Sequence, residues 1–158
     1  MTPEHEIELF RWAARGDEAA AHFLKAITDA AHAWDDVVDA DVPLDRCAIH
    51  EAFRALVLVV PANRFYRLHR DSLEPLIQQA AINWLVATDI EREPGGAMHV
   101  AYILRSSYID LVAHVALLTG GPDWARSVCR HVREMNQSET FDDYLTNLDR
   151  ERAARGEG

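Results

Sequence analysis

The sequence has few of the residues that stabilise small secreted domains or zinc fingers. Its 158 residues include only two cysteines, Cys47 and Cys129, which are too far apart for a disulfide framework or a zinc finger. Seven glycines and six prolines leave few points at which a helix must stop. The first residues lack the basic and apolar stretches of a secretory signal. We therefore expect a cytoplasmic setting and a core that needs no covalent cross-link.

Basic residues and long apolar runs are also scarce. The 16 lysines and arginines are outnumbered by 26 acidic residues, which gives a net charge of -10. The basic stripe that nucleic-acid-binding proteins carry is not visible. The longest nearly uncharged apolar stretch, residues 109–119, contains Asp110 and His114 and is too short and too polar to span a bilayer. The sequence therefore predicts neither a nucleic acid nor a membrane as partner.

Apolar residues recur at helical spacing along almost the whole chain. A chain of this length is typical of one domain, residues 1–158. We predict an all-α fold, a single-domain antiparallel bundle of five long helices plus one or two short ones. The predicted elements are a short helix within 1–16, long helices at 17–40, 43–60, 72–93, 97–119 and 123–135, and a last helix that begins near Thr140 and frays over 150–158. The helices 72–93 and 97–119 are expected to be central, and 62–71 to be an irregular or short helical connection.

Three aspartates form a D-D-x-x-D array near the end of the helix 17–40. Asp35 and Asp39 lie one turn apart on one face, with Asp36 beside them. Carboxylates this close repel at neutral pH unless water, an arginine or a hard divalent cation offsets the repulsion. Mg²⁺ and Mn²⁺ are cations that prefer such oxygen ligands. The same spacing also fits the solvated face of an amphipathic helix, so both interpretations stay open.

The two central helices carry polar residues on apolar faces. Asn83 and Glu91 share the core face of the helix 72–93, and Arg105 lies on an apolar face of the helix 97–119. A buried polar group needs a partner, and a buried arginine must be paired because it cannot lose its charge. In an up-and-down bundle these residues meet the D-D-x-x-D array at one end. Acidic residues ringed by arginine suit a metal-bridged diphosphate, but a core amide bonded to a neighbouring helix and an exposed Glu91 fit as well.

These motifs resemble those of a known enzyme family. Residues 35–39, Asp-Asp-Val-Val-Asp, resemble the aspartate-rich motif of class I isoprenoid synthases. In those all-α enzymes the motif binds Mg²⁺ and the substrate diphosphate. Asn83-x3-Ala87-x3-Glu91 is similar to the second metal motif of the family, which has Ser or Thr where this chain has Ala87. The chain is much shorter than such synthases, and the resemblance implies at most a truncated or repurposed relative.

A second resemblance is to the all-α nucleotide pyrophosphohydrolases. These proteins are of about this size, and acidic clusters on their helices bind Mg²⁺ to cleave nucleoside triphosphates. They usually carry paired E-x-x-E and E-x-x-D patterns. In place of such pairs, this sequence offers the D-D-x-x-D array with Asp89 and Glu91.

Two hypotheses about function follow. The first is a Mg²⁺- or Mn²⁺-dependent protein that binds or acts on a diphosphate-containing small molecule. Its metal ligands would be Asp35, Asp36, Asp39 and Glu91, its diphosphate-binding residues Asn83 and Arg105, and its catalytic residues Asp36 and Arg105. The alternative is a non-catalytic acidic helical interaction protein, either an oligomeric scaffold or an inhibitor of a basic partner. Acidity, short length and four tryptophans motivate this alternative.

Overall fold

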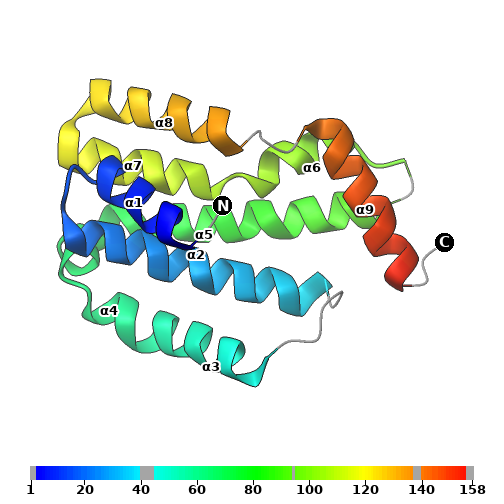
Figure 1. Ribbon diagram of the computed structural model, residues 1–158, viewed down its shortest axis with the longest axis horizontal. Coiled ribbons are helices and arrows are strands. Elements are labelled where there is room, and N and C mark those ends of the chain that lie inside the picture. The colour runs from blue at the N-terminus through cyan, green and yellow to red at the C-terminus, as the bar shows by residue number, and fades with distance from the viewer. Residues whose placement is uncertain (1–2, 40–44, 94, 137–139, 156–158) are drawn as a thin grey trace.

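The computed structural model describes residues 3–39, 45–93, 95–136 and 140–155, and these ranges contain helices and no strand (Figure 1). The all-α prediction is therefore confirmed, whereas an antiparallel bundle of five long helices stays a prediction. The elements are α1 (Pro3–Ala13), α2 (Glu18–Asp39), α3 (Arg46–Arg54), the π-helical stretch η1 (Ala55–Val59), α4 (Val60–Ala62), α5 (Arg64–Arg92), α6 (Met98–Arg105), α7 (Tyr108–Gly120), α8 (Pro122–Asn136) and α9 (Phe141–Arg155).

Helices begin where short polar side chains can accept the free N–H groups of a first turn. The Asp17 carboxylate accepts from the N–H groups of Ala19 and Ala20, at 2.9 and 3.1 Å, and so starts α2. Thr140 and Asp143 form a reciprocal capping box at the start of α9, with N–H to side-chain distances of 3.1 and 3.2 Å. Both starts are those that the sequence predicts.

At 62–71, where the sequence predicts an irregular or short helical connection, a short helical segment begins at Arg64 and joins the rest of α5 across a kink at His69. Asn63 caps it, accepting from the N–H groups of Phe65 and Tyr66 at 2.9 and 3.1 Å. Ser72, where the sequence predicts that the long helix 72–93 begins, lies inside α5 and donates its hydroxyl to the carbonyl of His69 at 3.0 Å. The helix leaves regular geometry only at His69, with φ -114° and ψ 16°.

The predicted helix 97–119 is divided into α6 and α7 at Ser106 and Ser107. The two serine hydroxyls donate to the carbonyls of Ile103 and Leu104, at 2.8 and 2.6 Å. Such local bonds compete with helix continuation. By length and composition alone, the stretch Met98–Gly120 is long and apolar enough to cross a membrane. A core helix passes the same test, and 39% of that window is buried inside the protein.

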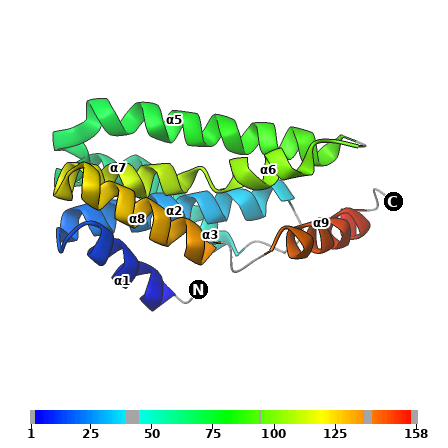
Figure 2. The same ribbon diagram turned by 90° about the horizontal axis from the view of Figure 1, so that it is seen from above.

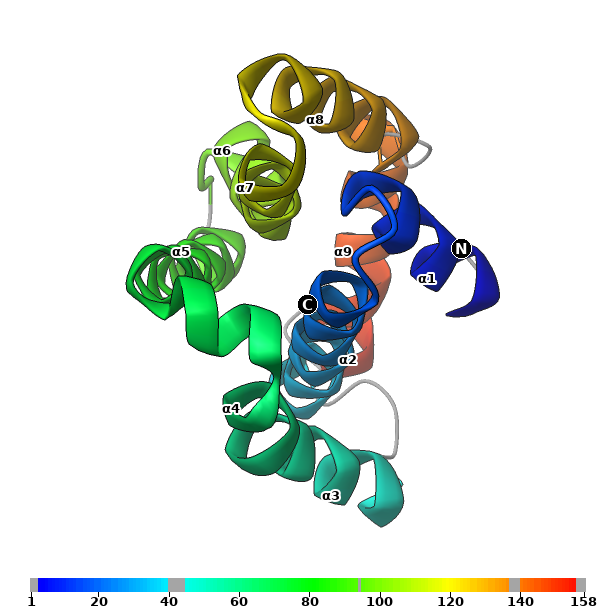
Figure 3. The ribbon, with the colours of Figure 1, turned by 90° about the vertical axis from the view of Figure 1, so that its left-hand side faces the viewer.

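The core lies at one end of the molecule. Its fully buried large side chains are Phe10, Phe23, Leu24, Leu73, Ile109, Val112, Val115 and Val128. They come from α1, the first half of α2, the first half of α5, α7 and α8. Figure 2 shows α5 on one side of α2 and α7, and α1 on the other. Figure 3 shows α3 and α4 on the outer side of α2, away from α7 and α8.

Candidate functional site

Arg105, the last residue of α6, lies between two of the acidic residues that the sequence singles out. Its Nε donates to Oε1 of Glu91 at 2.9 Å, and its Nη2 pairs with the other oxygen of the same carboxylate. Its Nη1 donates to Oδ1 of Asp35 at 2.9 Å. One guanidinium therefore joins α2, α5 and α6 through charge-assisted hydrogen bonds. We call Asp35, Glu91 and Arg105 the ionic cluster.

Trp84 belongs to the same site, although the sequence did not predict it as a site residue. Its indole Nε1–H donates to Oδ1 of Asp35 at 2.8 Å. The Arg105 guanidinium lies over its ring, 4.7 Å from the ring centre, and Trp34 packs against it at 5.1 Å. The sequence held a signal, because Trp84 shares a helix face with Glu91 and a buried indole N–H requires an acceptor.

The last helix, α9, covers the Glu91 end of the ionic cluster. Glu91 is 4% exposed, and the Tyr144 hydroxyl donates to its Oε1. The Arg152 guanidinium donates to the main-chain carbonyl of Glu91. The Tyr102 ring of α6 lies 5.2 Å from the Tyr144 ring and 5.5 Å from the Phe141 ring. These two contacts fix α9 on α6. Glu91 is thus buried and fully bonded instead of exposed at a helix end.

The other predicted site residues lie apart from the ionic cluster or outside the described residues. The Asn83 side chain donates to Ser107 Oγ at 2.9 Å and accepts from Gln79 at 2.8 Å, as a core amide bonded to a neighbouring helix does. Asp36 is exposed. Asp39 ends α2, and its side chain lies outside what the structure describes.

Within the described residues, no three His, Cys, Asp or Glu side chains gather as a group that could hold a metal ion. Asp35 and Glu91 instead face each other across Arg105, and a cation between them would have to displace that guanidinium. With two carboxylates and one guanidinium, the ionic cluster has a net charge of -1. As it stands, the ionic cluster ties α2, α5 and α6 together, and Tyr144 adds α9, which is a structural role.

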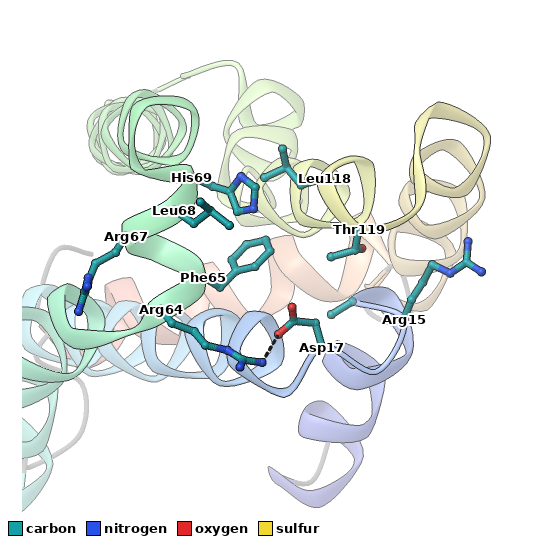
Figure 4. A pocket seen from close by; sticks show the side chains of 10 residues that line it. Arg15, Asp17, Arg64, Phe65, Arg67, Leu68, His69, Leu118 and Thr119 are labelled. Atoms are coloured by element: carbon teal, nitrogen blue, oxygen red, sulfur yellow. Dashed lines mark ion pairs between the residues drawn. The ribbon is translucent and has the colours of Figure 1, made fainter.

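A separate open pocket of about 770 Å³ lies at the other end of α2 and α5 (Figure 4). Phe65 and Leu118 line it, and Arg64 Nη2 lies 3.8 Å from Asp17 Oδ1 at its edge. Figure 4 shows Arg15 and Arg67 on opposite sides of the pocket, both directed away from its middle. These cations therefore do not converge on one point where an anion could sit.

On α7, His114 and Asp110 do not pair with each other. Asp110 accepts from Arg133 of α8 at 2.6 Å. His114 Nε2 is buried and has no hydrogen-bond partner within the described part of the chain. Burial lowers the pKa of His114, and the nearby His69 lowers it further.

No family model, curated protein or solved structure matches this chain, so its function must be inferred from its own residues.

Proposed function

We propose that the protein is a non-catalytic helical interaction protein that binds its partner through large apolar side chains exposed by its own fold. The observation that supports this proposal is the position of these side chains in the chain. Among the described residues, 13 of the 16 exposed large hydrophobic side chains lie between Trp34 and Ile103. That segment supplies only 5 of the 21 buried apolar residues. It therefore turns most of its large apolar side chains toward solvent.

Scattered exposed apolar residues are normal on any protein, but a concentration of them marks an interaction surface. These residues lie on the second half of α2 and on α3, η1, α5 and α6. Three of these elements are joined by the ionic cluster on their inner side. In this proposal, Arg105 holds α2, α5 and α6 in place so that their outer faces stay available. The expected antiparallel bundle of five long helices would supply the frame.

A site-specific photo-crosslink tests this proposal. A benzophenone side chain replaces Phe53 on α3 in one variant and Arg126, an exposed residue of α8, in the other. Both variants are made in the organism that contains the protein. We expect a discrete crosslinked product from position 53 and none from position 126. No product from either position, or equal products from both, would reject the proposal.

A second candidate function is the Mg²⁺- or Mn²⁺-dependent handling of a diphosphate. It is favoured by the half-exposed side chain of Asp35, which lies beside Arg105 and next to the exposed Asp36. In this candidate Asp35, Asp36, Asp39 and Glu91 hold the ion, and Asn83 and Arg105 contact the diphosphate. It requires Arg105 to leave Glu91 for the ligand.

Thermal melts in EDTA, in Mg²⁺, and in Mn²⁺ with pyrophosphate test the second candidate. A ligand at 100 times its Kd stabilises by about 2.7 kcal/mol, which for a chain of this size raises the melting temperature by about 5–10 °C. The candidate predicts such a rise, lost in Asp36→Ala and kept in Asp123→Ala, a control at an exposed aspartate of α8. Identical melts in all three conditions reject it and leave the interaction proposal unaffected.

A further inference from the structure

The helix formed by α3 and η1 carries two apolar stripes, and only the smaller side chains face the protein. Ala52, Ala55 and Val59 are half-buried, on the side that packs against α2. Every other described residue from 45 to 58 is exposed, and neither α3 nor η1 contains a buried residue. A second stripe, which we call the outer stripe, consists of Ile49, Phe53, Leu56 and Val57, exposed by 44–66%.

This distribution is the reverse of what packing within one chain favours. Burying a Val, Leu, Ile or Phe side chain contributes about 1.5–3 kcal/mol, so a helix gains most by turning its largest side chains inward. Here α3 and η1 place alanines against α2 and hold the outer stripe in solvent. Figure 3 shows α3 on the outer side of α2, where another molecule can reach it. The outer stripe therefore fits a partner outside the chain.

We infer that this partner is a second copy of the chain, bound through the outer stripe. The inference rests on the proposed function and names its partner. Charge is the first argument. Residues 46–59 contain two arginines and one glutamate, a net charge of +1, in a chain whose net charge is -10. Two acidic copies repel each other least where they meet through this helix. A basic partner would instead be drawn to the acidic surfaces elsewhere.

The outer stripe is also complementary to itself. Phe53 lies midway between Ile49 and Val57. A two-fold axis at Phe53 sets two antiparallel α3 helices together, as closed symmetric dimers require. Phe53 then meets its own copy, and Ile49 meets Val57 of the second copy. At positions 49, 53 and 57, apolar residues therefore face apolar residues.

The charged pair nearest Phe53 forms within the chain and not across the outer stripe. Glu51 and Arg54 pair with each other at 2.8 Å. Residues one and two apart on a helix point to different faces, so Glu51 points away from Phe53. The Glu51 carboxylate therefore does not oppose a contact between two copies of the stripe.

The outer stripe alone is smaller than a stable interface. The 14 residues of α3 and η1 form a helix about 21 Å long, whereas stable dimers bury about 800 Å² on each partner. The neighbouring α2 also exposes large apolar side chains, at Trp34 and Val37. We therefore expect a reversible dimer whose population depends on protein concentration.

Sedimentation equilibrium of the purified full chain tests this inference. The mass should rise from 17.8 kDa toward twice that value as concentration increases. Phe53→Glu places two carboxylates at the two-fold axis and should hold the mass at one chain. The control is Leu68→Glu, the same kind of change at a residue of α5 that is 77% exposed and outside the stripe. It should leave the dimer intact, and circular dichroism should show both variants folded.

A wild-type mass of one chain at every concentration overturns the second-copy inference as a whole. In that case a crosslink from position 53 to a different polypeptide still supports the proposed function. The absence of any crosslink from position 53 rejects both, so the two failures are distinguishable.

Discussion

At the scale of single residues, the central fact is that Arg105 compensates the buried charge of Glu91. Breaking a buried ion pair leaves a charge without a partner, which costs far more than the intact pair contributes. The Tyr144 hydroxyl donates a further hydrogen bond to Glu91, and the Trp84 indole N–H donates one to Asp35. The stability of the ionic cluster therefore depends on the presence of all its members.

Arg105→Met should lower the free energy of unfolding by about 3–5 kcal/mol, because Glu91 stays buried without its counter-ion. Urea unfolding measures this change. The matched control is Arg130→Met on α8, which breaks an exposed pair with Glu134 at 2.7 Å. The control should cost at most about 1 kcal/mol. Equal losses in the two variants would show that the ionic cluster contributes no more than a surface pair.

His114 should make stability depend on pH. Burial lowers the pKa of His114 in the folded protein below its ordinary value of 6.5, so the unfolded chain takes up the proton first. The contribution of neutral His114 to the free energy of unfolding is therefore complete above pH 6.5. It falls as the pH drops from there toward the pKa of His114 in the folded protein. Urea unfolding between neutral and acidic pH should show this slope.

His114→Gln should reduce that slope, since the glutamine side chain does not titrate. His22→Gln, on the exposed face of α2, serves as the control and should keep the wild-type slope. If both variants keep it, groups other than His114 cause the pH dependence.

The sequence indicates which residues need partners, but not which partners they find. Asn83, Glu91 and Arg105 stand out because each is polar on an apolar helix face. That Arg105 bonds Glu91 and Asp35, while Asn83 bonds Ser107, depends on how each helix is rotated against the next. Periodicity predicts on which face of its own helix a residue lies. It does not predict which neighbouring helix packs against that face.

At the scale of elements, local capping chemistry decides where prediction succeeds. Asp17 and Thr140 begin helices as their side-chain chemistry predicts. The start at Asn63 was missed, although asparagine is among the best caps, because serine is also a favourable cap and Ser72 stands at the first position of the predicted helix 72–93. The break at Ser106 and Ser107 was missed as well, since serine inside an apolar run carries no strong stop signal.

Asn63→Ala should lower the free energy of unfolding by about 2 kcal/mol. The asparagine caps α5, and its Nδ2 also donates to the carbonyl of Ala19 at 2.8 Å, which fixes the start of α5 against α2. Urea unfolding measures the loss. Asp45→Ala is the control, because Asp45 caps the exposed helix α3 and should cost about 1 kcal/mol or less. A loss at Asn63 no larger than that at Asp45 would contradict this role.

At the scale of the whole molecule, the two ends of the structure differ in what holds them together. One end has an apolar core with buried Phe10, Phe23 and Leu73. The other has the ionic cluster inside and large apolar side chains outside. The apolar spacing of the helix 43–60 predicted packing around the central helices. Spacing alone cannot tell whether such an apolar face packs against its own chain or against another molecule. In this helix the outer stripe lies in solvent.

The most direct measurement is the distance between spin labels on Cys47 of two copies, in a chain whose Cys129 is replaced by serine. Cys47 is exposed on α3, six residues before Phe53. A two-fold at Phe53 separates the two Cys47 positions by about 18 Å along the helices and about 8–10 Å between their axes, or about 20 Å in all. Pulsed electron paramagnetic resonance should show a distance near this value, absent in Phe53→Glu. No interaction between labels, or the same distance in the variant, would contradict the account.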